Sequence, residues 1–223
     1  MSTQITLPHA VPQHTMPRTA PVDLTGSIEL MGAPMQFARN SEIYGENEPA
    51  DYVYKLVSGT VRTYKILNDG RRQIGAFYLP GDVFGLEVGA AHLFSAEAVS
   101  NATVLVVKRS ALVNLAQRDG DVARQLWTFT ANELHRVQQH MLLLIKSAQE
   151  RVACFLLEMA ERFAAAETIE LPMSRQDIAD YLGLTIETVS RTLTQLESRA
   201  TIALPTSRRV VLRNRRALNQ LNA

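Results

Sequence analysis

The spacing of apolar residues divides the chain into a first part with a strand period and a second part with a helical period. From about residue 35 to residue 109, short apolar runs are separated by turn residues at roughly the 8–12-residue spacing that is typical of an all-β barrel or sandwich. The clearest predicted strands are residues 52–57, 60–67, 73–78, 96–100 and 103–108. This pattern predicts a small antiparallel β-barrel.

Turn residues and prolines mark the limits of the β-rich part. Residues 58–59 (Ser-Gly) and 68–70 (Asn-Asp-Gly) are predicted hairpin turns, because Gly, Asn and Asp tolerate the positive φ that such turns need. Residues 1–24 contain four prolines and follow no regular period, so we expect a flexible arm there. A short helix is expected at residues 25–31.

After residue 110 the period becomes helical, first to about residue 118 and then over a long segment from residue 121 to about residue 147. Apolar positions in the long segment repeat in steps of three and four, as in the seam of a two-stranded coiled coil. Such a stripe could pack on its own barrel, but a helix of about 27 residues spans ~40 Å and is longer than a barrel of this size requires. We therefore expect a homodimer joined along the stripe, which consists of Trp127, Thr130, Leu134, Val137, Met141, Leu144 and Ala148.

A helix-turn-helix is predicted in the last third of the chain. After a helix at residues 149–165, in which Cys154 is expected to be an inert apolar position, Ser174 and Asp177 form a capping box that begins a new helix. Gly183 ends that helix, and Thr185 can cap the next one. Two short helices joined by a Gly-containing turn of about four residues are typical of DNA-binding proteins.

The second of these helices has a polar outward face. Val189, Leu193 and Leu196 point inward, whereas Glu187, Ser190, Arg191, Thr194 and Ser198 form another stripe. Arg can pair with guanine, Glu can accept from cytosine, and Ser or Thr can reach bases or phosphates, so the stripe suits a helix in the major groove. The alternative is an ordinary amphipathic helix whose solvated face holds a Glu187–Arg191 pair.

Residues 202–204 and 210–212 flank a basic turn and predict a β-hairpin like the wing of winged-helix proteins. Arg side chains on a wing contact phosphates without reading sequence. The residues expected to contact the DNA backbone are Ser174, Arg175, Thr185, Thr188, Thr194, Arg208 and Arg209.

Charge and composition narrow the function further. The chain of 223 residues has a net charge of +1, yet residues 187–223 hold seven Arg against two Glu, a net +5 that leaves −4 for the rest. A basic end on an acidic body suits binding to phosphates. A single Cys excludes an internal disulfide and a thiolate metal cluster, and no apolar run approaches the roughly 18–20 residues of a membrane span. We expect a cytoplasmic protein that binds no membrane.

The order of these elements, with GDVFG at residues 81–85 and DIADYLGLTIETVSRTL at residues 177–193, resembles the CRP/FNR family of bacterial transcription regulators. The resemblance implies an α+β fold with a β-barrel like the cyclic-nucleotide-binding jelly roll at residues 25–118. It also implies a dimerisation helix at 119–147 and a winged helix-turn-helix at 148–223. ETVSR at residues 187–191 resembles the FNR branch, which reads TTGA-type half-sites in an inverted repeat of double-stranded DNA. By that resemblance the base-reading residues are Ile186, Glu187, Ser190 and Arg191.

Departures from the family pattern concern its sensors. The arm lacks the cysteines that hold an iron–sulfur cluster in oxygen-sensing FNR proteins. Gly85-Leu86-Glu87 is followed by no Arg up to Val99, so the cation that anchors a cyclic phosphate is missing. The only His of the barrel region, His92, is expected to be a surface residue of a loop rather than a haem ligand.

These departures predict a regulator without a cofactor or metal, most like the FixK-type activators that control microaerobic, denitrification or nitrogen-fixation genes. By the same resemblance, Asp69 and Arg71 in the barrel hairpin are candidate contacts to RNA polymerase. The alternatives are a CRP-like regulator gated by an unrecognised small effector, and a cupin-like enzyme. His92 alone cannot supply the several His ligands of a cupin, so we expect no enzyme activity.

Overall fold

The computed structural model describes residue 28, residues 31–164 and residues 167–221. The arm expected at residues 1–24 lies outside the described residues, as does most of the short helix expected at residues 25–31.

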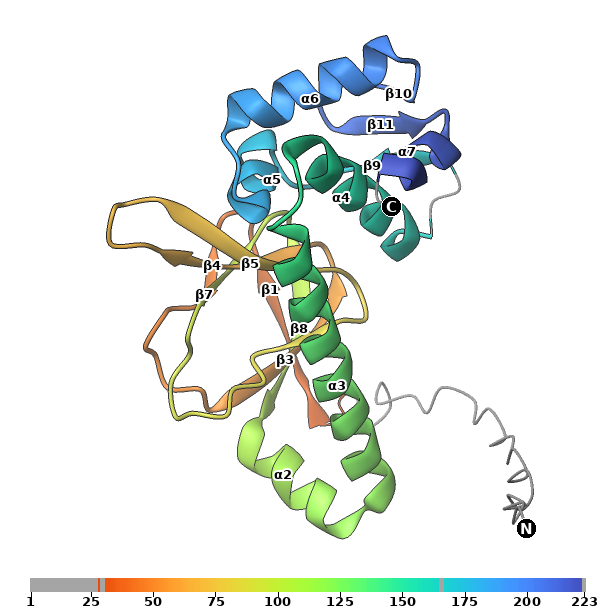
Figure 1. Ribbon diagram of the computed structural model, residues 1–223. Helices are drawn as coiled ribbons and strands as arrows, with labels where there is room; N and C mark the ends of the chain where they lie inside the picture. Colours follow the sequence, from red (N-terminus) through yellow and green to blue (C-terminus); the bar gives the residue numbers. More distant parts are fainter. Residues whose placement is uncertain (1–27, 29–30, 165–166, 222–223) are drawn as a thin grey trace, which may run out of the picture.

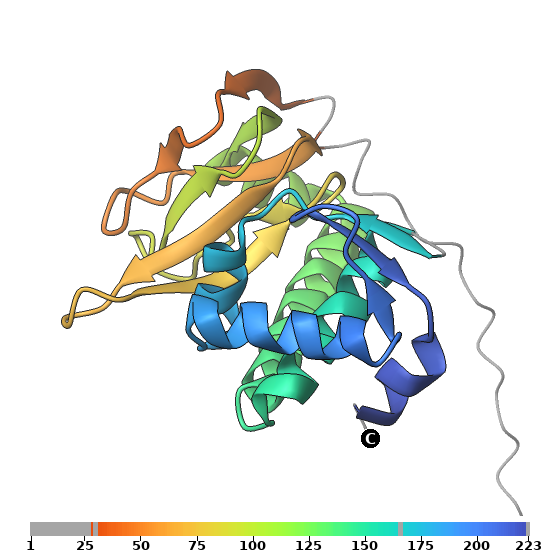
Figure 2. The same ribbon diagram turned by 90° about the horizontal axis from the view of Figure 1, so that it is seen from above.

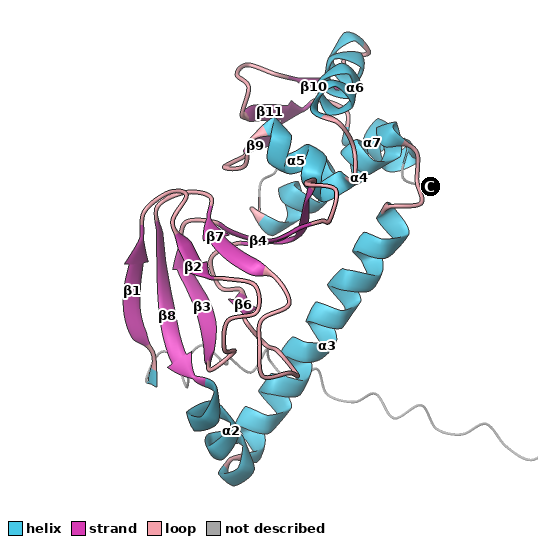
Figure 3. Cartoon of the chain, turned by 90° about the vertical axis from the view of Figure 1, so that its left-hand side faces the viewer, coloured by secondary structure: helices cyan, strands magenta, loops and turns pink. Residues whose placement is uncertain are grey.

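The described residues of the N-terminal part form two antiparallel four-stranded sheets that face each other (Figures 1 and 3). One sheet has the order β1-β8-β3-β6 and the other β2-β7-β4-β5. The strands are β1 (Ala33–Phe37), β2 (Glu42–Tyr44), β3 (Tyr52–Ser58), β4 (Val61–Ile66), β5 (Arg72–Tyr78), β6 (Val83–Phe84), β7 (Ser95–Ala98) and β8 (Ala102–Lys108). We call this part the β-domain.

The β-domain has the expected jelly-roll-like fold, in which two separate sheets face each other and do not close into one barrel. Its core lies between the sheets because alternate residues of each strand point inward, among them Leu56, Val61 and Val104, all fully buried. The five clearest predicted strands are present with ends that differ by one or two residues, and β1, β2 and β6 are additional.

Two helices leave the β-domain at the end of β8. The first, α2 (Arg109–Arg118), is followed by the long α3 (Gly120–Leu143), whose first backbone N–H groups are capped by the Asp119 side chain. The helix α3 ends at Leu143, four residues before the expected residue 147. The next helix begins after Ser147, because the Ser147 hydroxyl and the Glu150 carboxylate form a capping box.

The C-terminal part is a separate module at the far end of α3 (Figure 1). It consists of α4 (Ala148–Arg162), β9 (Thr168–Glu170), α5 (Arg175–Leu182), α6 (Ile186–Ser198), β10 (Ile202–Ala203), β11 (Arg209–Leu212) and α7 (Arg215–Leu221). The strands form a sheet in the order β10-β11-β9. Seen from above, α6 lies along the outer side of this module (Figure 2). The predicted hairpin is present, and β9 adds a third strand that the sequence pattern did not indicate.

Candidate nucleic-acid interface

The two helices of the predicted helix-turn-helix begin and end where the sequence places their caps. The Ser174 hydroxyl accepts from the Asp177 backbone N–H, while the Asp177 carboxylate accepts from the Ser174 backbone N–H, so the capping box is confirmed. Gly183 has the left-handed φ of 61° that ends α5. Thr185 caps α6 by accepting from the backbone N–H of Thr188. Local sequence therefore fixes the turn that separates the helices.

The two faces of α6 differ in burial as expected. Val189, Leu193 and Leu196 are buried in the module core. Glu187, Arg191 and Thr194 are exposed, and Ser190 is half-buried between them. Ile186 is exposed at the start of the helix. Side chains of the right types for base recognition thus lie together on the exposed side of α6.

The charged groups of this face are exposed, and their hydrogen bonds are to neighbouring residues of the helix start. The Glu187 carboxyl accepts a hydrogen bond from its own backbone N–H in the first turn of the helix, and a second from the Thr185 hydroxyl. Both bonds lower the pKa of this carboxyl, so it is ionised at neutral pH. The Arg191 guanidinium donates to the Thr188 hydroxyl oxygen at 3.4 Å. Among the ion pairs of the described residues, none joins Glu187 to Arg191, so the pair expected for an ordinary solvated helix is not formed.

The residues expected to touch phosphates have different surroundings. Ser174 is held by the capping box, where its hydroxyl donates to Asp177 at 2.8 Å, and Arg175 is half-buried beside it. Thr185 is exposed and Thr188 half-exposed at the start of α6. Thr194 is exposed, and its hydroxyl donates to the Ser190 carbonyl oxygen.

The two arginines of the wing differ in exposure and in their partners. The exposed turn is formed by residues 205–207, and both arginines follow it. The half-buried Arg208 donates to the Pro172 carbonyl oxygen at 3.1 Å. The exposed Arg209 forms an ion pair of 3.1 Å with Glu170 on β9. The added strand thus gives Arg209 an acidic partner within the module.

The apolar stripe of α3 is exposed along most of its length. The exposed fraction is 77% for Trp127 and 57% for Val137, and Leu134 and Met141 are similar. The opposite face holds the helix on the β-domain, where Val122 is buried and the Arg136 guanidinium lies over the Tyr78 ring at 4.5 Å. Most of the stripe therefore does not pack on its own β-domain, although Val137 also lines the cavity between α3 and that domain. Leu144 is a partial exception, because it follows the last residue of the helix and is half-buried.

Comparisons with known proteins identify the family. Residues 34–119 match the cyclic nucleotide-binding domain and residues 150–221 match the Crp-like helix-turn-helix domain. The nitrogen fixation regulation protein FixK of Azorhizobium caulinodans is 54% identical over 202 residues, which cover 88% of this chain and 82% of that protein. The chain belongs to the CRP/FNR family.

Two further comparisons place it within that family. The FixK of Rhizobium meliloti is 39% identical over 92% of this chain and 95% of its own length. The structure of FixK2 from Bradyrhizobium japonicum is 55% identical and has a TM-score of 0.83, covering 86% of this chain and 98% of that one. The chain is a FixK-type transcription regulator with a DNA-binding helix-turn-helix.

Because residues 34–119 match the cyclic nucleotide-binding domain, the cavity between the β-domain and α3 is a candidate site for such a ligand. This cavity has a volume of about 390 Å³ and is lined by apolar residues such as Phe84, Phe94 and Val137. The charged lining residues among those described are the carboxylates Glu87 and Glu133. A cyclic phosphate needs a cationic or N–H-rich partner, so these residues do not fit a cyclic nucleotide.

The position of His92 corrects the expectation of a surface residue. Its exposed fraction is 1%, and its ring stacks on Tyr44 with 3.6 Å between the ring centroids. Backbone hydrogen bonds with Asn47 and Glu48 tie its loop to the loop between β2 and β3, and the stack on Tyr44 places the imidazole in the core. The described residues contain no group of three or more His, Cys, Asp or Glu side chains that could hold a metal ion.

The hairpin expected to meet RNA polymerase projects from the β-domain between β4 and β5 (Figure 2). Asp69 and Arg71 are exposed at its tip and form an ion pair of 2.7 Å with each other. This pair lowers the pKa of Asp69, mainly through the hydrogen bond from the Arg71 side chain.

Within the described ranges, each helix is too short or too polar for a membrane span.

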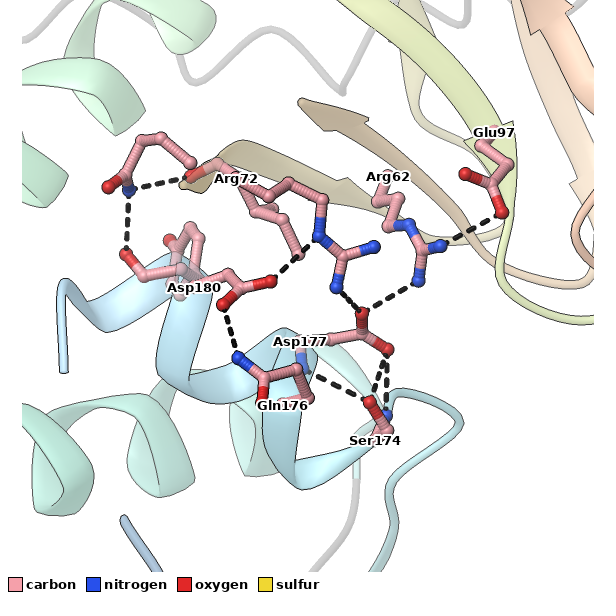
Figure 4. A network of polar contacts seen from close by, with 10 residues as sticks. Arg62, Arg72, Glu97, Ser174, Gln176, Asp177 and Asp180 are labelled. Carbon is pink, nitrogen blue, oxygen red and sulfur yellow. Dashed lines mark hydrogen bonds and ion pairs between the residues drawn. The ribbon is translucent and has the colours of Figure 1, made fainter. Parts of the chain in front are cut away.

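Four charged residues that the sequence pattern did not single out link the β-domain to α5. Arg62 on β4 and Arg72 on β5 contact Asp177, Arg72 also contacts Asp180, and Glu97 on β7 contacts Arg62 (Figure 4). The partners are more than 100 residues apart in sequence, except Arg62 and Glu97. No local period could indicate such contacts, because they depend on how the two parts pack.

Proposed function

We propose that this regulator binds, as a homodimer, an inverted repeat of double-stranded DNA with TTGA-type half-sites, and activates transcription from it. The observation that carries the proposal is that one protomer exposes a polar reading face on α6 and an uncovered apolar stripe on α3. A two-fold dimer along the stripe would carry two equivalent α6 helices. Two helices are needed to meet two half-sites about one DNA turn, ~34–36 Å, apart.

Each exposed side chain of α6 has a role in this proposal. Arg191 pairs with guanine O6 and N7, Glu187 accepts from cytosine N4, and Ser190 donates to a base edge. Ile186 contacts a thymine methyl. The phosphate contacts come from both helix starts, from Thr194 and from the wing, through Ser174, Arg175, Thr185, Thr188, Thr194, Arg208 and Arg209.

Sedimentation of the purified chain with and without a consensus inverted repeat tests this proposal. We expect one dimer per repeat, and much weaker binding to a duplex that holds a single half-site. A monomer that binds both duplexes equally well would contradict it.

Relatives suggest the genes under control. The FixK proteins of Azorhizobium caulinodans and Rhizobium meliloti are named for regulation of nitrogen fixation, and AadR of Rhodopseudomonas palustris, 41% identical, is named a transcriptional activatory protein. We propose that this chain acts in the cytoplasm as an activator of microaerobic, denitrification or nitrogen-fixation genes. A genome-wide footprint of the bound DNA in cells grown at low oxygen tests this assignment.

We also propose that operator binding needs neither an iron–sulfur cluster nor a cyclic nucleotide. The lining of the cavity supports the second part, since its charged residues are the carboxylates Glu87 and Glu133, and Arg136 is already paired with Glu133 and so does not serve as an anchor for a cyclic phosphate. We expect no heat of binding from cyclic AMP in calorimetry and no iron in protein purified without oxygen. A mobility shift that depends on cyclic AMP would instead favour a regulator gated by a small effector.

The proposed contact with RNA polymerase is the exposed pair at the β4–β5 tip. Reversing both charges, with Asp69→Arg and Arg71→Asp, keeps the pair itself and changes the surface that a partner meets. We expect lower transcription in a purified system with operator affinity unchanged. Equal losses of both activities would point away from this surface.

A further inference from the structure

The contact between the β-domain and α5 is a buried layer of charges. Asp177 receives two arginines at one carboxylate oxygen, Arg62 at 2.7 Å and Arg72 at 2.6 Å. Asp180 lies three residues further along the same face of α5 and receives Arg72 at 2.7 Å. Figure 4 shows the two guanidinium groups side by side between the strands and the helix. The helix is therefore held at two points one turn apart.

The charged groups in these contacts are largely buried, so each of them needs a partner of opposite charge. The exposed fraction is 9% for the Arg62 side chain and 6% for that of Asp177. Glu97 accepts from the other end of the Arg62 guanidinium at 2.8 Å. Ion pairs shielded from water need complete partners, since a lone buried charge is strongly unfavourable. A different angle between the β-domain and α5 would leave some of these charges unpaired.

Asp177 links this layer to the helix-turn-helix itself. One of its carboxylate oxygens accepts from both arginines, while the other accepts from the backbone N–H and the hydroxyl of Ser174. The same side chain thus caps α5 and attaches it to the sheet. The helix α6 packs on α5 through the module core, so fixing α5 also fixes the direction in which α6 points.

We propose that Arg62 and Arg72 of the β-domain are positioning residues for DNA binding, because they hold the helix-turn-helix at the angle in which α6 meets the operator. With these contacts formed, the reading face of α6 is exposed on the outer side of the module (Figures 1 and 2). The proposal rests on the role of α6 in operator binding proposed above. Neither arginine needs to touch DNA.

The contacts set an orientation rather than hold the module together. The C-terminal module has a core in which Phe155, Leu182 and Leu196 are fully buried, and this core continues to Ile74, Phe77 and Val99 of the β-domain. An apolar contact between Phe77 and Tyr181, with ring centroids 5.2 Å apart, also remains when the charges are removed. A variant without the ion pairs should therefore stay folded and populate several angles between the two parts.

Three variants test the proposal: Arg72→Gln, Asp180→Asn and the double change. Each leaves the Arg62–Asp177 pair in place, which keeps Asp177 from becoming an unpaired buried charge. If only a tenth of the molecules keep the competent angle, the dissociation constant for the operator rises about tenfold. The rise should be the same for a consensus operator and for one with the guanine substituted, because α6 is unchanged. The double variant should lose no more affinity than Arg72→Gln alone, because Arg72→Gln already removes the Arg72–Asp180 pair together with the Arg72–Asp177 pair.

Controls separate positioning from loss of fold. Lys65→Gln is the matched change, since Lys65 lies on β4 and pairs with Glu46 inside the β-domain at 2.6 Å; its affinity should equal that of the wild type. Arg72→Lys keeps the cation and should recover part of the affinity. Amide hydrogen exchange should remain slow in α6 of every variant.

The outcomes are distinct. Unchanged affinity in Arg72→Gln would overturn the proposal, and raised affinity would mean that the ion pairs restrain DNA binding instead. A loss of affinity confined to the consensus operator would assign Arg72 to base recognition and would also overturn it. If amide exchange became fast in α6 of Arg72→Gln, the milder Asp180→Asn variant would decide. Failure of the wild type to bind the operator would contradict the proposed function and not the positioning role.

Discussion

Two amphipathic helices, α3 and α6, bury one face each and expose faces of different chemistry. On α3 the exposed side carries Trp127, Val137 and other apolar residues, whereas on α6 it carries Glu187 and Arg191. Exposed apolar surface of this extent is typical of a protein interface, and an exposed polar face with a cation suits a nucleic acid. The helical period is the same in both, so the composition of the exposed face distinguishes the partners.

Making the α3 stripe polar should have the largest effect. We expect the double change Leu134→Asp and Val137→Asp to give monomers, because it places carboxylates in the middle of the proposed interface. Losing the second binding module should lower operator affinity about 10²- to 10⁴-fold. Sedimentation velocity and a binding titration measure the two effects. Leu144 is a poorer choice for this test than the sequence indicated, because it is half-buried beyond the end of α3.

Gln138→Asp is the matched control, since Gln138 is an exposed polar residue on the same helix. It should remain a dimer. If the Leu134 and Val137 variant also sediments as a dimer, the stripe is not the interface.

On α6 the corresponding change is Arg191→Ala. A bidentate Arg–guanine pair contributes about 1–3 kcal/mol of discrimination, and a symmetric dimer makes it twice. Roughly 2–6 kcal/mol, or ~30-fold to 10⁴-fold in affinity, should be lost on the consensus operator. The same variant should bind a guanine-substituted operator as well as the wild type does. Retained preference for that guanine would show that α6 reads the operator in another register.

The parts of the fold that depend on neighbouring residues were predictable from sequence. The capping box at Ser174, the turn at Gly183 and the cap at Thr185 are confirmed, because each is decided within about four residues. The main strands and the overall order of β-domain, long helix and helix-turn-helix are also present. The base-reading roles of Glu187 and Arg191 stay predictions, since they need a DNA partner to be tested.

The parts that depend on distant contacts were not predictable. His92 lies in a loop by its local pattern, and only the stack on Tyr44 makes it a core residue. Arg62 and Arg72 are ordinary strand residues by their local pattern, yet their carboxylate partners are far along the chain. The strand β9 is too short to have a period and forms only because β11 provides an edge. Tertiary packing decides each of these cases.

The arginines of the wing differ from Arg191, because they should add affinity for DNA without discriminating between base sequences. We expect Arg208→Ala to weaken binding to consensus and substituted operators alike, and to reduce the slope of log K against log salt by about one for each phosphate that is no longer neutralised. Arg209→Ala should change the slope less, because Arg209 already pairs with Glu170. Titrations at four salt concentrations measure both slopes. A larger change for Arg209 would place that residue, not Arg208, on the phosphates.

The smallest effect concerns the buried side of α3, where His140 stacks on Tyr181 with 4.2 Å between the ring centroids. Burial, and then the nearby Arg136 cation, lower the pKa of His140. The unfolded chain therefore binds a proton near pH 6.5 that the folded chain does not, so His140 makes stability fall as the pH drops below that value. Burial raises the pKa of Glu158, and the effect on stability is opposite, because the free energy of unfolding falls as the pH rises above about 4.5.

Denaturant unfolding of wild type and His140→Gln between pH 5.5 and pH 8 isolates the histidine, since Glu158 is common to both. We expect the variant to lose less stability than the wild type on acidification, and His135→Gln, on the exposed side of the same helix, to behave as the wild type. Identical pH profiles for all three proteins would contradict this prediction. They would mean that the folded chain protonates His140 as easily as the unfolded chain does, so that the buried side of α3 tolerates a positive charge.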